Sequence, residues 1–163
     1  MLNEKELDHI RLVAEQVATT VRSGHTVYVS VVGHALGGHL PRLKKETGYM
    51  QPLNADSPLG KDDFVFAIGY DDIFPKLVEE TQKAEAGLAW SLTDYKTPGT
   101  GGPDAIPPGQ VFINQRWALG DAVVTVPGYE IRILPPSGVI SETILWMVLA
   151  EINSREAPIS LPK

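Results

Sequence analysis

A buried strand that runs directly into a glycine-rich turn is the feature that most constrains this chain. Residues 26–40 read TVYVSVVGHALGGHL, an apolar run followed by three glycines and two histidines. Such a run is typical of a strand covered on both faces in a parallel sheet. The turn after such a strand lies at the N-terminus of the next helix, where α/β folds bind phosphate groups. The stretch therefore predicts the position of a ligand site but leaves the ligand open.

Strands and helices alternate along the rest of the chain. Further short apolar runs predict strands at residues 49–53, 64–68, 88–92 and 111–114, with additional candidates at 122–126 and 130–134. Apolar residues spaced three and four apart predict helices at residues 3–22 and 73–86, and a helix at 137–153 is apolar nearly all round. Pro41 in a first turn and Gly48 as a stop predict a short helix at 40–47. This order predicts one domain, residues 1–163, with an α/β fold of three layers: a mainly parallel five-stranded sheet flanked by helices.

Several helix starts carry residues that favour capping. Asn3, with Glu6 three residues later, forms a capping-box pattern at the first helix. Asp71 or Asp72 is expected to cap the helix at 73–86, and Ser137 to cap the last helix, because short polar side chains accept hydrogen bonds from the first free N–H groups.

Composition narrows the class of protein. The chain of 163 residues carries 14 Lys and Arg against 20 Asp and Glu, a net charge of −6, which argues against a nucleic-acid or anionic membrane partner. It has no cysteine, which excludes disulfides, thiolate nucleophiles and Cys-ligated zinc. No apolar stretch approaches the ~20 residues that a membrane span needs. We expect a cytoplasmic protein without a cofactor.

Three segments together carry a resemblance to a known family. They read VYVSVVGHALGGHL, KDDFVFAIGYDDIFPKLVEETQKAEAGLAWSLTD and VISETILWMVLAEI. In order and spacing they resemble the sugar isomerase (SIS) domain, and within it the phosphoheptose isomerase branch. The resemblance covers most of the chain. It implies a five-stranded parallel sheet, a phosphosugar site at the strand ends, and a homodimer or homotetramer whose subunits share that site.

The chain also departs from the family's pattern. Where the family usually has a phosphate-binding Ser or Thr in the first turn, this chain has Gly37, and its second turn, residues 69–72, reads GYDD instead of being rich in Ser and Thr. The resemblance places an acid–base Glu at Glu46 or one residue from it. The family's histidine on the last helix is missing, since Leu149 or its neighbours stand there.

The two histidines of the first turn offer another source of proton transfer. His34 and His39 are the histidines that fall in the predicted site, and imidazole titrates near neutral pH, as a base acting next to a carbonyl requires. The alternative is a turn histidine bonded to backbone. The pair does not share one face of a helix and has no third ligand, so we expect no metal.

The remaining candidates also have plain structural alternatives. Glu46 suits a solvated helix face and Glu142 the positive end of the last helix, as well as acid–base work. The candidate catalytic residues are His34, Glu46 and Glu142. The candidate substrate-binding residues are Gly33, His34, Gly37, Gly38, His39, Asp71, Thr93, Ser137 and Ser141. The long loop at 93–109 is either a lid that brings Lys96 to a phosphate or a surface insertion.

Three functions follow in order of preference. The first is an aldose–ketose isomerase acting on a sugar phosphate. The second is a non-catalytic sensor that binds a phosphorylated sugar or nucleotide sugar and responds by changing its assembly, which the departures from the family favour. The third is a dinucleotide-binding domain. The spacing of Gly33, Gly37 and Gly38 does not match its glycine fingerprint, although Asp56 offers an acidic residue about 20 positions on.

Overall fold

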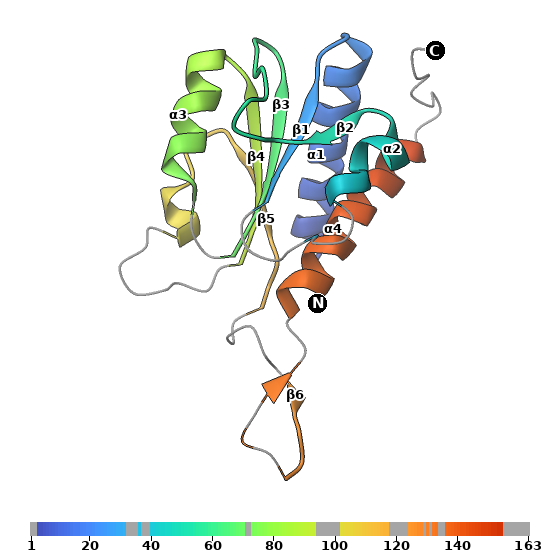
Figure 1. Ribbon diagram of the computed structural model, residues 1–163, viewed down its shortest axis with the longest axis vertical. Coiled ribbons are helices and arrows are strands. Elements are labelled where there is room, and N and C mark those ends of the chain that lie inside the picture. The colour runs from blue at the N-terminus through green and yellow to red at the C-terminus, as the bar shows by residue number, and fades with distance from the viewer. Residues whose placement is uncertain are drawn as a thin grey trace.

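Five parallel strands form the central sheet of the protein (Figure 1). A computed structural model describes residues 3–31, 36, 40–70, 73–93, 102–117, 124–128, 130, 132–133 and 136–154. From one edge to the other the sheet contains β2 (Met50–Pro52), β1 (Val27–Val31), β3 (Phe64–Ile68), β4 (Gly87–Leu92) and β5 (Val111–Asn114). Because all the strands are parallel, their C-terminal ends meet along one side, here called the carboxyl edge.

Helices cover both faces of this sheet and complete three layers. On one face lie α1 (Glu4–Arg22), α4 (Pro136–Asn153) and the short α2 (Leu43–Thr47), which follows the 3-10 turn η1 (Leu40–Arg42). On the other face lies α3 (Pro75–Ala84). Each face buries its own apolar cluster, because alternate residues of a strand point to opposite sides. The predicted α/β fold and its five-stranded parallel sheet are confirmed.

Asn3 caps α1 as predicted, whereas the carboxylate of Glu6, the expected second half of the capping box, contacts Arg116. The Oδ1 atom of Asn3 accepts a hydrogen bond from the backbone N–H of Glu6 at 3.1 Å. Because α1 leads directly into β1, which runs back along it, this N-terminus lies at the carboxyl edge (Figure 1). The N-terminus of α4 lies at the same edge.

Two helices begin at other residues than predicted. The helix α3 has Phe74 at its N-cap and begins at Pro75, two residues later than predicted, and the expected caps Asp71 and Asp72 lie outside the described residues. The helix α4 begins at Pro136, and Ser137 therefore lies inside its first turn with no exposed surface. Both helices start with proline, whose fixed φ suits the first helical position and whose missing N–H costs nothing there.

The two late strand candidates form a separate hairpin. β6 (Val124–Thr125) pairs antiparallel with β7 (Arg132–Ile133), and this pair lies beyond the lower end of the main sheet in Figure 1. Within the predicted loop at 93–109, the structure has the 3-10 turn η2 (Gly102–Ala105). None of the described helices is long and apolar enough to cross a membrane.

Candidate site at the carboxyl edge

Polar side chains from several elements meet at the carboxyl edge of the sheet. Thr93 follows β4, and residues 115–117 follow β5. The backbone N–H of Thr93 donates to the carbonyl of Tyr70 at 2.7 Å, and its hydroxyl donates to the carbonyl of Trp117. Thr93 is completely buried. These two hydrogen bonds link the segment after β3 to the segments after β4 and β5 at the carboxyl edge.

Gln115 is the centre of this connection. Its side chain is almost wholly buried, with 2% of the residue exposed. The Nε2 atom donates to the carbonyls of Gly69 and Ser91 at 3.1 and 2.8 Å. The Oε1 atom accepts from Nε1 of Trp117 at 2.7 Å and from the hydroxyl of Ser141 at 3.4 Å. A single amide thus links the ends of three neighbouring strands to the first turns of α4.

The structure describes five of the candidate residues, of which four lie after β4 or in the first turns of α4 and one, Glu46, lies on α2. Thr93 and Ser141 belong to the Gln115 cluster, and Ser137 is buried one helical turn before Ser141. Glu142 lies next along α4 with a buried Oε1 atom. Glu46 lies exposed on α2 and forms an ion pair with Arg42 at 3.3 Å, which fits the solvated-face alternative and does not test a catalytic role.

Six of the candidates lie outside the described residues. They are Gly33, His34, Gly37, Gly38, His39 and Asp71. Lys96 of the long loop lies outside them as well. The roles assigned to these residues from the sequence therefore stay predictions.

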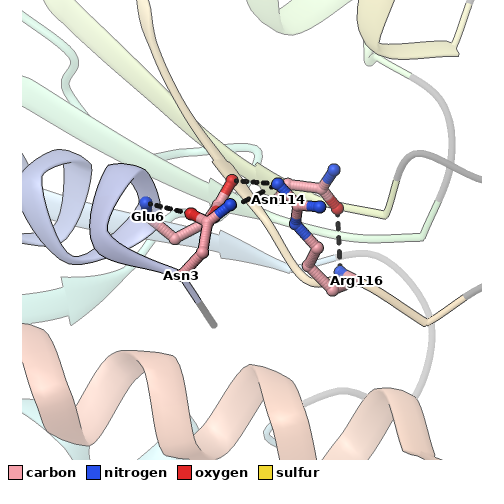
Figure 2. A network of polar contacts seen from close by, with 4 residues as sticks. All are labelled: Asn3, Glu6, Asn114 and Arg116. Atoms are coloured by element: carbon pink, nitrogen blue, oxygen red, sulfur yellow. Dashed lines mark hydrogen bonds and ion pairs between the residues drawn. The ribbon is translucent and has the colours of Figure 1, made fainter. Parts of the chain in front are cut away.

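A second network lies beside the Gln115 cluster, between β5 and the start of α1 (Figure 2). Nη2 of Arg116 contacts both carboxylate oxygens of Glu6, at 3.2 and 3.4 Å. The side chain of Glu6 is only 4% exposed, whereas that of Arg116 is 38% exposed. The backbone N–H of Arg116 donates to Oδ1 of Asn114 at 2.8 Å. This network places a cation in contact with solvent at the carboxyl edge.

Aromatic packing adds a third feature to the edge. The rings of Tyr70 and Trp117 meet edge to face, with centroids 5.8 Å apart and planes at 88°. Tyr70 is partly exposed. This arrangement fixes the indole whose N–H donates to Gln115.

Sequence reasoning missed Gln115, Arg116 and Glu6 as site residues. Glu6 was identified only as the partner of Asn3 in a capping box, and residues 115–117 follow a strand without matching a catalytic or ligand-binding motif. A signal was nevertheless present: polar residues directly after a buried parallel strand face the edge where α/β folds place their sites.

Other possible sites lie away from this cluster. A cavity of about 680 Å³ lies between α3 and residues 53–59 and contains none of the predicted site residues in its lining. Among the described residues no group of three or more His, Cys, Asp or Glu side chains is placed to hold a metal ion.

The fold is similar to that of a known enzyme structure. A phosphoheptose isomerase from Francisella tularensis superposes with a TM-score of 0.57 over 90% of this chain and 83% of that chain, at 13% sequence identity. No protein-family model and no curated protein sequence matches the chain. At this identity the likeness shows a shared fold, and the activity of that enzyme does not follow for this chain.

Proposed function

We propose that the chain is a sugar-phosphate-binding protein that acts as an aldose–ketose isomerase of the phosphoheptose isomerase type. The observation that carries this proposal is the cluster of Thr93, Gln115 and Ser141 at the carboxyl edge of a five-stranded parallel sheet. Parallel α/β sheets bind their ligands at this edge. The likeness in fold to a phosphoheptose isomerase supports the choice of ligand class.

The proposed reaction moves a proton between C2 and C1, the carbonyl carbon of the aldose. A base removes the proton from C2 of the aldose and a proton is returned at C1, while the hydroxyl proton of O2 passes to O1, so that the carbonyl moves from C1 to C2 and gives the ketose. In this proposal His34 or Glu46 is the base, with Glu142 as a second carboxylate. Backbone N–H groups of the first turn, at Gly37 and its neighbours, bind the phosphate.

The buried hydroxyls have a supporting role in the proposal. Ser141 donates to Gln115 and is completely buried, as is Ser137. Both therefore form the floor of the edge, and the ligand binds above them among the turns that follow β1, β3 and β4. Subunits of a homodimer or homotetramer complete the site.

A sensor without catalysis is the second candidate function. Leu149, near the position of the family's histidine on the last helix, is buried in the apolar core with 5% of its surface exposed. An acid–base group is thus replaced by a core side chain. In this alternative the protein binds a phosphorylated sugar or nucleotide sugar and responds by changing its assembly.

Thermal unfolding in the presence of ligands tests the ligand class. The panel contains hexose 6-phosphates, a ketoheptose phosphate, the same sugars without phosphate, and NAD(H). A ligand at a hundred times its Kd stabilises the protein by about 2.7 kcal/mol. We expect sugar phosphates to raise the Tm. A panel in which no sugar phosphate does so contradicts both candidate functions, and a rise with NAD(H) alone supports the dinucleotide alternative.

Proton exchange then separates the enzyme from the sensor. The enzyme exchanges the C2 proton of a bound sugar phosphate with solvent, whereas the sensor binds the same compound without exchange. His34→Ala and Glu46→Gln test the two bases, each with binding measured alongside. Glu80→Gln is the matched control for Glu46, because Glu80 forms an equivalent ion pair with Lys76 at 3.4 Å on α3, which covers the other face of the sheet.

A further inference from the structure

The guanidinium of Arg116 is bonded on one side and open to solvent on the other. Among the described residues Glu6 is its one hydrogen-bond partner, through Nη2. A guanidinium carries five N–H donors in a planar fork, so most of them stay available. The side chain is 38% exposed. Arg116 therefore presents unused donors and a positive charge at the carboxyl edge.

The backbone holds this residue in an unusual conformation. Arg116 has φ of +60°, in the left-handed region that non-glycine residues rarely adopt. The side chain of Asn114 stabilises the turn by accepting from the N–H of Arg116 at 2.8 Å. The flanking residues, Gln115 and Trp117, are fixed in the buried cluster. Strained positions of this kind gather at ligand sites, where neighbours hold a side chain in a set direction.

Glu6 gives the guanidinium its orientation. A buried carboxylate needs its cation, because removing the partner leaves an uncompensated charge away from water. The pair is therefore fixed, and it joins residues 110 positions apart in the sequence. A structural ion pair between α1 and β5 explains this contact by itself. It does not account for the donors that stay open to solvent at the carboxyl edge, where Arg116 follows β5.

Phosphate chemistry fits this exposed side. The first turn has Gly37 where the resemblance implies a Ser or Thr, and the second turn reads GYDD, so neither turn supplies the Ser or Thr hydroxyls that the family uses for its phosphate. A planar guanidinium matches two phosphate oxygens at once and also supplies charge. We propose that Arg116 binds the phosphate group through the N–H donors that Glu6 leaves free, with Glu6 as its positioning residue; the proposal rests on the proposed function.

The test compares two variants that differ only at Arg116. Glu6→Gln keeps the cation, and the double variant Glu6→Gln/Arg116→Met removes it without leaving a lone buried carboxylate. Lys61→Met is the control for loss of a positive charge. Lys61 pairs with Glu85 at 2.7 Å beside the start of β3, at the end of the sheet opposite to the carboxyl edge. Arg116→Lys keeps the ion pair but loses the fork.

The first measurement uses inorganic phosphate at constant ionic strength, with chloride as the comparison, and follows the Tm of each variant. We expect phosphate to stabilise the wild type, Glu6→Gln and Lys61→Met, and to bind about tenfold to a hundredfold more weakly to the double variant. Arg116→Lys should bind with intermediate affinity. Equal stabilisation of Glu6→Gln and the double variant, or no stabilisation of the wild type, overturns the proposal.

The second measurement uses the sugar phosphate that raises the Tm of the wild type most, together with the same sugar without phosphate. We expect the double variant to lose affinity for the phosphorylated sugar alone, whereas a general loss of structure lowers both affinities. Unchanged affinity overturns the role of Arg116 and leaves the proposed function standing. Binding of inorganic phosphate through Arg116, with no sugar phosphate bound by any variant, overturns the proposed function alone.

Discussion

At the scale of single residues, the side chain of Gln115 bonds to four residues of the candidate site, although no sequence motif identifies it. Its amide bonds to Gly69, Ser91, Trp117 and Ser141. Gln115→Met fills a similar volume but leaves these buried groups without their partner, which costs about 1–3 kcal/mol for an unsatisfied group. We therefore expect the variant to lose about 2–3 kcal/mol in the free energy of unfolding, measured with urea. We also expect it to bind sugar phosphates more weakly.

The control for this prediction is Gln51→Met. Gln51 accepts a surface hydrogen bond from Lys44 at 3.2 Å, so its replacement should change the free energy of unfolding by less than about 0.5 kcal/mol. If both variants unfold at the same urea concentration as the wild type, the amide of Gln115 does not stabilise the carboxyl edge.

Tyr49 gives a prediction about pH. Burial raises the pKa of its phenol above the ordinary value of 10.0, because the charged form loses its hydration. The neutral phenol is thus favoured in the folded state. Its contribution to stability is complete below about pH 10 and declines as the pH rises through the folded-state pKa. We expect Tyr49→Phe to reduce the loss of unfolding free energy between about pH 9 and about pH 11. A loss as large as in the wild type contradicts this assignment.

At the scale of elements, the end of β3 depends on a glycine for reasons of space. A Cβ at Gly69 would lie 2.7 Å from Cζ of Phe74 and 3.2 Å from Cδ2 of Leu92. Gly69→Ala should therefore push apart α3 and β4 and lower the free energy of unfolding by about 1–3 kcal/mol. Gly138→Ala is the matched control, because nothing lies within 4 Å of its Cβ position in α4. We expect it to be neutral or stabilising by up to about 1 kcal/mol, since alanine favours helices. Equal effects in thermal unfolding exclude crowding at Gly69.

The elements themselves were largely predictable, because their signals are local. Apolar runs of five or six residues gave β1, β3 and β4, and Asn3 with Glu6 gave the start of α1. The start of α3 was not predictable in the same way. Asp71 and Asp72 have good capping side chains, but Pro75 favours the first helical position and places the N-cap at Phe74.

At the scale of the whole molecule, the sequence predicts the edge at which the candidate site lies but not the contacts that build this edge. The alternation of strands and helices predicts a ligand site at the carboxyl edge. The contacts that build the edge join distant residues, such as Glu6 with Arg116 and Gly69 with Gln115. No local spacing encodes such pairs, because they depend on the order of strands in the sheet and on the packing of α1 beside β5.

The outer face of α4 carries the last prediction. Val139 and Trp146 are 59% and 46% exposed although the helix is otherwise largely apolar. The exposed residues of α4 recur at helical spacing, so they share one face: Val139, Thr143, Trp146, Ala150 and Asn153. Large apolar side chains gathered on one face favour contact with another protein surface. In the proposed homodimer or homotetramer, that surface is a second copy of the chain.

Trp146→Glu should therefore break the assembly, because a carboxylate placed in an apolar interface loses its hydration without gaining a partner. We expect sedimentation velocity to show a dimer or tetramer for the wild type and a monomer for this variant at the same concentration. Lys83→Glu, an exposed change of charge on α3 across the sheet, should leave the sedimentation coefficient unchanged. If the wild type sediments as a monomer, the exposed face of α4 is not an interface between copies of the chain. A Trp146→Glu variant that keeps its assembly places the interface elsewhere, and the subunits would then complete the carboxyl edge by another face.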